Sequence, residues 1–321
     1  TLIGGLAGDA LTDADYNVAL GTQALSADTL GSRTVAIGHA TLQTQNFTTA
    51  TDTYNTAVGF SAGTTLTTGV QNTLIGGLAG DALTDADFNV AVGYLAGSTD
   101  VRGSHTTSVG YGALANQNFT TATDTYNTAV GSLAGVAVTT GIQNTLIGAL
   151  AGDAITDADN NVALGYLALS TNQLGSSNVA IGVDALSTAN PSTATSTLNT
   201  AVGFHAGKLV TTGTLNTFIG ADTGLAAVTG DVNTCVGYGA GQVVTSGSSN
   251  TAVGDRAGFA LTTGSNNLLL GNDAGRTGSP GGNLTTSSNS IRLGDENIVE
   301  CQIQVDWTIA SDERDKTDFT A

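Results

Sequence analysis

Short apolar runs that end in glycine recur along the whole chain, with polar residues between them. In the run NTAVG at residues 55–59, Asn55 comes first, and Thr56 and Val58 flank Ala57. β-Branched residues two positions apart are typical of a short strand, whose side chains alternate between two faces. The residue before the closing glycine is Ile, Val or Leu in all seventeen copies of the run. The pattern predicts an all-β chain of many short strands.

The spacing of the closing glycines, which we call anchor glycines, is regular. Successive anchors lie seventeen, seventeen, twenty-one and seventeen positions apart, and this 72-residue pattern occurs three times before the gaps settle at seventeen and end with one of twenty-three. A fixed period indicates a solenoid whose turns rest only on their neighbours. We predict a β-solenoid (β-roll) of about seventeen 17- to 21-residue turns over 1–276, then an irregular turn and a strand segment over 277–310. The anchors are Gly4, Gly21, Gly38, Gly59, Gly76, Gly93, Gly110, Gly131, Gly148, Gly165, Gly182, Gly203, Gly220, Gly237, Gly254, Gly271 and Gly294.

Two kinds of turn follow the anchors. In one kind a glycine four residues after the anchor precedes an apolar residue, as in Gly63 with Leu66; in the other a leucine stands there, as at Leu25. Because protein interiors are close-packed, we interpret this as one core position filled from either of two places in the chain. The turn that begins at Gly93 has no apolar side chain at either place, since Gly97 and Asp100 stand there. We expect Val101 to substitute.

Two further residues mark the turns. Asparagine opens the run in thirteen of sixteen cases. It can form a hydrogen-bonded ladder along the solenoid axis or simply suit turn geometry, and the sequence leaves both open. Most 17-residue turns have a glycine ten after the anchor, as at Gly69, where we expect the positive φ of a tight turn.

Each turn contains only three or four sizeable apolar side chains, and many of them are Ala or Val. Their burial offsets little of the backbone entropy lost on folding. We expect the columns of alanine to let solenoids approach closely, so that chains pack side by side as a parallel homotrimeric fibre.

Charge excludes some partners. The formal net charge is −18, from 26 acidic residues against eight Lys plus Arg. Phosphate would be repelled, so we expect no nucleic-acid partner, and anionic membrane surfaces are disfavoured for the same reason. No apolar run approaches the length that crosses a bilayer, so we expect no membrane insertion. Cys235 and Cys301 fit no metal motif and leave the redox compartment undecided.

The repeated phrase N-T-A-[IV]-G-x-x-A-G over residues 1–294 resembles the head repeats of YadA-like trimeric adhesins and the shafts of phage tail fibres. This resemblance implies a trimeric structural or adhesive fibre, extracellular, on a virion or a cell surface. Residues 307–316, WTIASDERDK, are similar to the start of the intramolecular chaperone (S74 peptidase) domain of tail fibres, and 311–321 would be its first part. That resemblance implies self-cleavage, with Ser311 as nucleophile and Lys316 as its base.

The 21-residue turns carry a four-residue insertion, and insertions on one side of a solenoid often bind ligands. They contain four of the few aromatic residues, which suit stacking on a sugar of a cell-surface glycan or receptor. Equally, these rings could cap the core of the widened turn. The four are Phe47, Tyr54, Phe119 and Tyr126.

Paired aspartates recur once in every four turns, on the order of 19 Å apart. Such pairs could bind Ca²⁺, but aspartate also suits turns, and we favour the turn interpretation, with no cofactor and no metal site. The pairs are Asp13 with Asp15, Asp85 with Asp87 and Asp157 with Asp159.

Three other functions compete with the phage fibre. A Thr-rich ice- or surface-binding solenoid needs regular flat threonine columns, which the 21-residue turns interrupt. A bacterial trimeric adhesin remains an alternative. A glycan hydrolase needs paired carboxylates, and Glu occurs only at positions 296, 300 and 313, beyond the regular shaft. We therefore expect no enzyme activity apart from the self-cleavage implied above.

Overall fold

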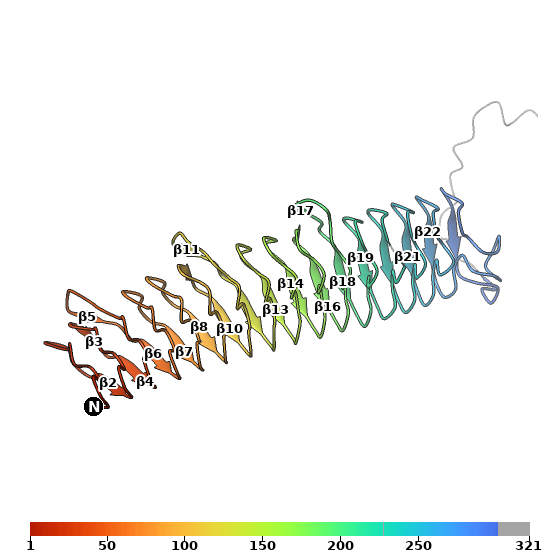
Figure 1. The fold of residues 1–321 in the computed structure, drawn as a ribbon. Coiled ribbons are helices and arrows are strands. Elements are labelled where there is room, and N and C mark those ends of the chain that lie inside the picture. Colours follow the sequence, from red (N-terminus) through yellow and green to blue (C-terminus); the bar gives the residue numbers. More distant parts are fainter. Residues whose placement is uncertain (227, 301–321) are drawn as a thin grey trace, which may run out of the picture.

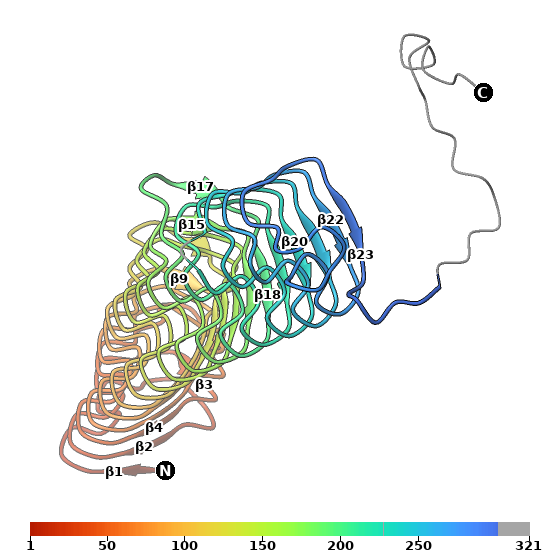
Figure 2. The ribbon, with the colours of Figure 1, turned by 90° about the vertical axis from the view of Figure 1, so that its right-hand side faces the viewer.

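A computed structural model describes residues 1–226 and 228–300 as a single rod of stacked turns (Figures 1 and 2). No helix occurs in these ranges, and seventeen short strands form one parallel sheet along the rod. Neighbouring strands pair in register, as Thr56↔Thr73 and Val58↔Ile75 do. The prediction of an all-β solenoid is confirmed. The strands of the sheet are β1 (Leu2–Ile3), β2 (Val18–Leu20), β4 (Val35–Ile37), β6 (Thr56–Val58), β7 (Thr73–Ile75), β8 (Val90–Val92), β10 (Thr107–Val109), β12 (Thr128–Val130), β13 (Thr145–Ile147), β14 (Val162–Leu164), β16 (Val179–Ile181), β18 (Thr200–Val202), β19 (Thr217–Ile219), β20 (Thr234–Val236), β21 (Thr251–Val253), β22 (Leu268–Leu270) and β23 (Ile291–Leu293).

Three two-stranded sheets accompany the main sheet, one at each 21-residue turn. Their strands project from one side of the rod (Figure 1). They pair β3 (Gly31–Ser32) with β5 (Thr51–Asp52), β9 (Gly103–Ser104) with β11 (Thr123–Asp124), and β15 (Gly175–Ser176) with β17 (Thr195–Ser196).

The anchor glycines are required for two reasons. Gly59 has φ of +142°, a region that side-chain-bearing residues rarely adopt. A Cβ there would lie 2.4 Å from the carbonyl oxygen of Gly76, the anchor of the next turn. The anchors therefore form a column in which consecutive turns touch through their backbones.

The middle residue of each strand points into the rod, and its two neighbours point outward. In β6, Ala57 is fully buried while Thr56 and Val58 are partly exposed. Ala62, three residues after the anchor, is also buried. The expectation that alanine columns let separate chains approach is therefore wrong, because these alanines face the interior of their own solenoid.

The core position after the anchor is filled as predicted, since Leu25 and Leu66 are both fully buried. The structure adds a third source of volume, the middle of the strand itself. Leu74 lies between two turns whose glycines make room for it: a Cβ at Gly63 would lie 2.6 Å from Leu74 Cδ1, and one at Gly80 would lie 2.8 Å from Leu74 Cδ2.

The turn that begins at Gly93 lacks all three sources. Val101 is partly exposed and does not fill the core, so the expectation that it substitutes is wrong. Asp100 is buried there just as Asp28 is in the turn that contains Leu25, so it does not replace the missing side chain, and a cavity of about 10 Å³ remains beside Gly97 and Ser108. That is room for about one water molecule.

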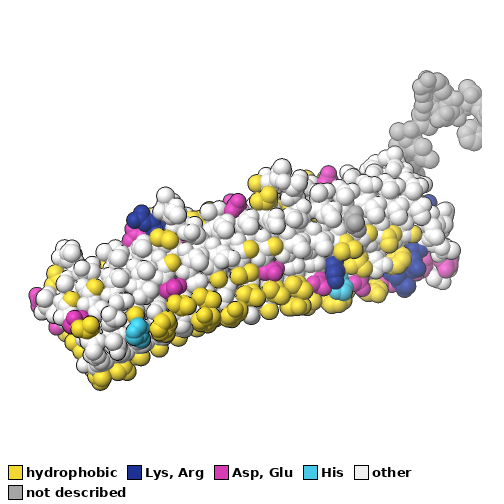
Figure 3. Space-filling view, in the orientation of Figure 1, with side chains coloured by type: hydrophobic (Ala, Val, Ile, Leu, Met, Phe, Trp, Pro, Cys, Tyr) yellow, Lys and Arg dark blue, Asp and Glu magenta, His cyan; other side chains and the backbone are white. Residues whose placement is uncertain are grey.

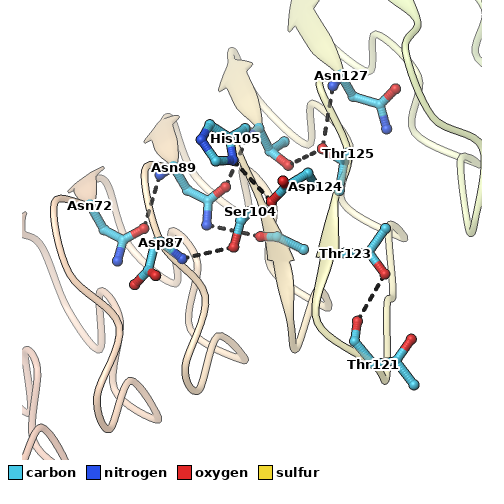
Figure 4. Close-up of polar contacts among 12 residues, drawn as sticks. Asn72, Asp87, Asn89, Ser104, His105, Thr121, Thr123, Asp124, Thr125 and Asn127 are labelled. Carbon is cyan, nitrogen blue, oxygen red and sulfur yellow. Dashed lines mark hydrogen bonds and ion pairs between the residues drawn. The ribbon is translucent and has the colours of Figure 1, made fainter.

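The opening asparagines form a hydrogen-bonded ladder along the axis, interrupted where Thr34 and Thr106 replace asparagine. The ladder interpretation is therefore confirmed. Asn89 N donates to Asn72 Oδ1 at 3.0 Å (Figure 4). The Nδ2 of Asn72 donates to the Ala86 carbonyl at 2.9 Å. The same pattern links Asn144 to Asn127 and Asn161 to Asn144. The amide of Asn144, for example, satisfies two backbone groups of the following turn, the Ala158 carbonyl and the Asn161 N–H.

The prediction of positive φ at Gly69 is wrong. Positive φ occurs two residues later, at Gln71. Glycine is required at position 69 because a Cβ would lie 2.2 Å from the Ala86 carbonyl oxygen of the next turn.

Candidate functional site

The inserted aromatic residues divide into a buried pair and an exposed pair. Phe47 and Phe119 are only 6% and 7% exposed, so they cap the core of the widened turns and are not available to stack on a ligand. Tyr54 and Tyr126 are each 54% exposed. The capping interpretation therefore holds for the phenylalanines, and ligand binding by the tyrosines stays a prediction.

A buried polar network holds each of the first two insertions in place. The Asp28 carboxylate accepts hydrogen bonds from the backbone N of Gly31 and of Phe47, each at 3.1 Å. It also accepts one from Gln45 Nε2 at 2.6 Å, and Gln45 Oε1 accepts one from Asn55 Nδ2 at 2.9 Å. These polar groups are hydrogen-bonded to one another inside the rod. The network therefore positions the insertion and offers no group to a ligand.

The second insertion has the same network, built on Asp100 and Gln117. In the third insertion Asn172 and Ala189 stand at the corresponding positions. Asn172 still bonds the backbone of Gly175 but has no glutamine partner. The third widened turn is thus a chemically simpler version of the other two.

Exposed aromatic rings line up beside the first insertion. The guanidinium of Arg33 lies 4.9 Å from the Tyr16 ring centre and 5.8 Å from that of Tyr54, and its Nε is 3.0 Å from Asp52 Oδ2. The guanidinium of Arg33 therefore covers one face of each ring. The three side chains come from successive turns, so each lies about one turn from the next along the axis. A sugar would have to use the remaining faces or edges.

The second insertion repeats this arrangement with histidine in place of arginine. His105 lies 4.8 Å from the Phe88 ring and 5.2 Å from the Tyr126 ring, between centroids. Its Nδ1 lies 3.2 Å from Asp124 Oδ1 (Figure 4). In the third unit the histidine and aspartate positions are occupied by Ser177 and Ser196, so both members of this His–Asp contact are absent together.

The paired aspartates hold turns. Asp87 Oδ1 accepts from Val70 N at 2.7 Å, one turn earlier, and Asp157 Oδ1 accepts from Thr139 Oγ1 at 2.7 Å. Asp85 Oδ1 lies 3.2 Å from Arg102 Nε. In residues 1–226 and 228–300 no cluster of three or more His, Cys, Asp or Glu is arranged to hold a metal ion.

Two other aspartates are poorly satisfied. The Oδ1 atoms of Asp81 and Asp153 are buried and have no hydrogen-bond partner. Burial raises the pKa of both carboxyl groups above the ordinary value of 3.8. Each lies five residues after its anchor, at the same place in successive 72-residue units.

The proposed self-cleavage pair, Ser311 and Lys316, lies outside the described residues, as does the segment 311–321.

An apolar column runs along the outer face of the main sheet, and its exposure was not predicted from the sequence. The residue before each anchor glycine points outward, and all seventeen are Ile, Val or Leu. We call this set the outer apolar column; Ile75 is 38% exposed and Leu164 is 43% exposed. Tyrosines just after the anchors widen it, including Tyr94, Tyr111 and Tyr166, each more than half exposed. An apolar stripe follows the lower edge of the rod in Figure 3.

The signal for this surface was present in the sequence. Ile, Val or Leu precedes every anchor, whereas the position before it is usually Ala. The alanine points inward because the interior of the solenoid is narrow. The larger Ile, Val or Leu beside it therefore points outward.

No protein-family model matches the chain, and no curated protein matches it. The described residues contain no helix that could span a membrane. The surface chemistry therefore carries the functional argument.

Proposed function

We propose that this chain is the shaft of a structural or adhesive fibre, in which parallel copies associate laterally through the outer apolar column. The observation that supports this is the column itself, apolar at all seventeen positions and partly or fully exposed throughout. At about 4.8 Å per turn the column extends roughly 80 Å. Contiguous exposed apolar surface of this extent marks an interaction site.

The periodicity of the column favours a second copy as its partner. Its side chains recur at the spacing of the solenoid turns, and only a surface of the same period meets them continuously along the rod. Burial of these side chains would contribute about 25 cal/mol per Å² of apolar surface removed from water. Three copies, each presenting one such column to a common axis, form a closed fibre with no column left exposed.

The resemblance described above implies that such a fibre lies outside a cell or on a virion, as a phage tail fibre or an adhesin. In that setting the three insertions project from the shaft and present exposed rings such as Tyr54 and Tyr126 to a cell-surface glycan or receptor. This adhesive role is the second part of the proposal, and it depends on the exposed rings rather than on the column.

Sedimentation of the purified chain tests the assembly. We expect an elongated trimer that resists heat and detergent, and a variant with Ile75→Lys and Leu164→Lys that sediments as a monomer, because lysine would be desolvated in the interface. A matched control, Thr68→Lys with Thr212→Lys, adds the same charge at exposed positions outside the column and should remain trimeric. A wild-type chain that sediments as a compact monomer would refute the proposal.

A further inference from the structure

The main sheet ends in an open edge. Within residues 1–226 and 228–300, β23 pairs with β22 alone, and no strand lies on its far side. β23 is the last strand at the blue end of the rod in Figure 2. A solenoid needs a cap at such an end, because an open strand edge presents unpaired backbone groups to other chains.

An apolar groove lies beside this edge, and we call it the terminal groove. It has a volume of about 550 Å³. The side chains of Leu293 and Ile298 are 40% and 58% exposed, so the groove is open to solvent. Exposed apolar surface next to an unpaired strand edge marks a place where a further strand can bind. The apolar residues that line the groove are Leu270, Pro280, Ile291, Leu293 and Ile298.

The chain that leaves β23 folds back over the last anchor glycine. Ser279 Oγ donates to the Gly294 carbonyl at 3.1 Å, which holds one wall of the terminal groove in place. A Cβ on Gly294 would overlap Ile298 Cγ1, whereas at an earlier anchor such as Gly254 it would meet the carbonyl of the next anchor. Ile298 therefore occupies the place that a further turn would take.

The chain continues from the terminal groove into a segment with the sequence pattern of a strand. Glu300, the last of the described residues, itself lines the groove. In residues 301–307, CQIQVDW, apolar residues alternate with polar ones, which is typical of a strand with one buried face. The apolar members are Cys301, Ile303, Val305 and Trp307.

We propose that residues 301–307 dock in the terminal groove and add an antiparallel strand to the open edge of β23. The connection, residues 294–300, is too short for the crossover of about a dozen residues that a parallel strand needs, whereas an antiparallel strand needs only a short turn. The tether at Glu300 gives this segment a high effective concentration at the groove, which favours it over a segment of another molecule. Docking covers Leu293 and Ile298 and pairs the free backbone groups of β23.

The fluorescence of Trp307 tests this docking, because Trp307 is the only tryptophan of the chain. In the folded chain we expect its emission at shorter wavelength than in the same chain unfolded by urea, and we expect acrylamide to quench it less. Trp307 precedes Ser311, so the tryptophan stays attached to the rod even after the self-cleavage that the resemblance implies.

Two variants should release Trp307. Leu293→Asp with Ile298→Asp places charges in the terminal groove, and both the emission and the quenching of Trp307 should shift to the values of the unfolded chain. Ile303→Asp with Val305→Asp should have the same effect and changes no residue of the rod, so it keeps the test valid if the first variant does not fold. Circular dichroism of each variant shows whether the rod is intact.

The matched control is Leu2→Asp with Ile3→Asp, at the opposite edge of the same sheet. These side chains are 49% and 58% exposed, and the control should leave the emission of Trp307 unchanged. In the wild-type chain, a Trp307 as accessible to acrylamide as in the unfolded chain would overturn the inference. Unchanged emission in both releasing variants would overturn it as well.

Mixed refolding distinguishes docking within one chain from docking on a neighbouring copy. The variant with Leu293→Asp and Ile298→Asp, which keeps Trp307, is refolded with an excess of chains that have an intact groove and carry Trp307→Phe. Emission that stays at the unfolded value supports docking within the chain, and recovery of the short-wavelength emission would overturn it. The inference concerns a single chain and does not rest on the lateral assembly proposed above, which sedimentation tests separately.

Discussion

At the scale of single residues, this fold depends on backbone conformations that most proteins use sparingly. Leu25, Gln71 and Leu78 have φ between +53° and +57°, although left-handed backbone is unfavourable for residues with a side chain. The cost is of order 1 kcal/mol or more for each residue. This conformational cost is tolerated because each left-handed residue lets its turn form backbone hydrogen bonds with the neighbouring turns. It also directs the side chain to the same place in every turn.

The asparagine ladder was one of two interpretations that the sequence allowed, and only the structure separates them. An asparagine that recurs at a fixed place in each turn gives the same sequence repeat whether its amide forms hydrogen bonds within its own turn or with the next one. The spacing shows that the residue recurs, whereas the direction of its amide depends on how turns stack.

We expect the substitution Asn144→Ala to destabilise the chain by about 2–5 kcal/mol, because it leaves buried backbone groups unsatisfied. Asn144 Oδ1 accepts from Asn161 N at 3.0 Å, and its Nδ2 donates to the Ala158 carbonyl at 2.9 Å. The free energy of unfolding from urea denaturation measures the effect. Exposed Asn116→Ala is the control and should change it by less than about 0.5 kcal/mol; equal effects at the two positions would contradict the role of the ladder.

The pKa values of Asp81 and Asp153, raised by burial, predict a pH dependence. The folded state binds protons more tightly than the unfolded state, so these carboxyls reduce the free energy of unfolding as pH rises from 3.8 through the raised folded-state pKa. The double variant Asp81→Asn with Asp153→Asn should therefore be more stable than the parent at pH 7, with the advantage lost near pH 3. Denaturation at both values tests this, with exposed Asp13→Asn as control; an advantage independent of pH would show that ionisation is not its cause.

At the scale of the single turn, the core follows a rule of shared volume. A leucine after the anchor, an apolar residue three places later, or a leucine in the strand fills the same space. The first two could be predicted from the sequence because they alternate within one turn. The third could not, because Leu74 occupies space opened by glycines in two different turns, Gly63 and Gly80.

The defective turn at Gly93 gives the sharpest test of this rule. The double variant Gly97→Leu with Ser108→Ala restores the pair found at the equivalent positions of the preceding 72-residue unit, Leu25 with Ala36. We expect it to fill the cavity and raise the free energy of unfolding by about 1–2 kcal/mol, the gain from a buried leucine less its left-handed strain.

The matched control for that variant is Gly80→Leu, which places the same residue at the equivalent position of an occupied turn. A Cβ there would lie 2.8 Å from Leu74 Cδ2, so overpacking should destabilise the chain by about 1–3 kcal/mol. The two substitutions should thus have opposite signs in urea denaturation. Two losses would contradict the rule.

At the scale of the whole molecule, the repeat predicts the rod but not its surfaces. The 17-residue period is sufficient for a solenoid, because stacking of equivalent turns is the way such a chain buries its small core. Which side of each strand faces outward depends on the width of the interior. For that reason the sequence leaves Phe47 open to a ligand or to the core, and the exposed role of the residues before the anchors was missed.

Because turns contact only their neighbours, a whole 72-residue unit should be removable without loss of fold. Deletion of residues 77–148 joins Gly76 to Ala149, the residue equivalent to Gly77, and preserves every contact type along the columns. We expect a folded, assembled rod shorter by about 19 Å in small-angle scattering. Deletion of 77–140, eight residues less, breaks the phase of the turns and should yield an unfolded or aggregated chain. If both deletions fold equally well, the stacked columns are not what holds the rod together.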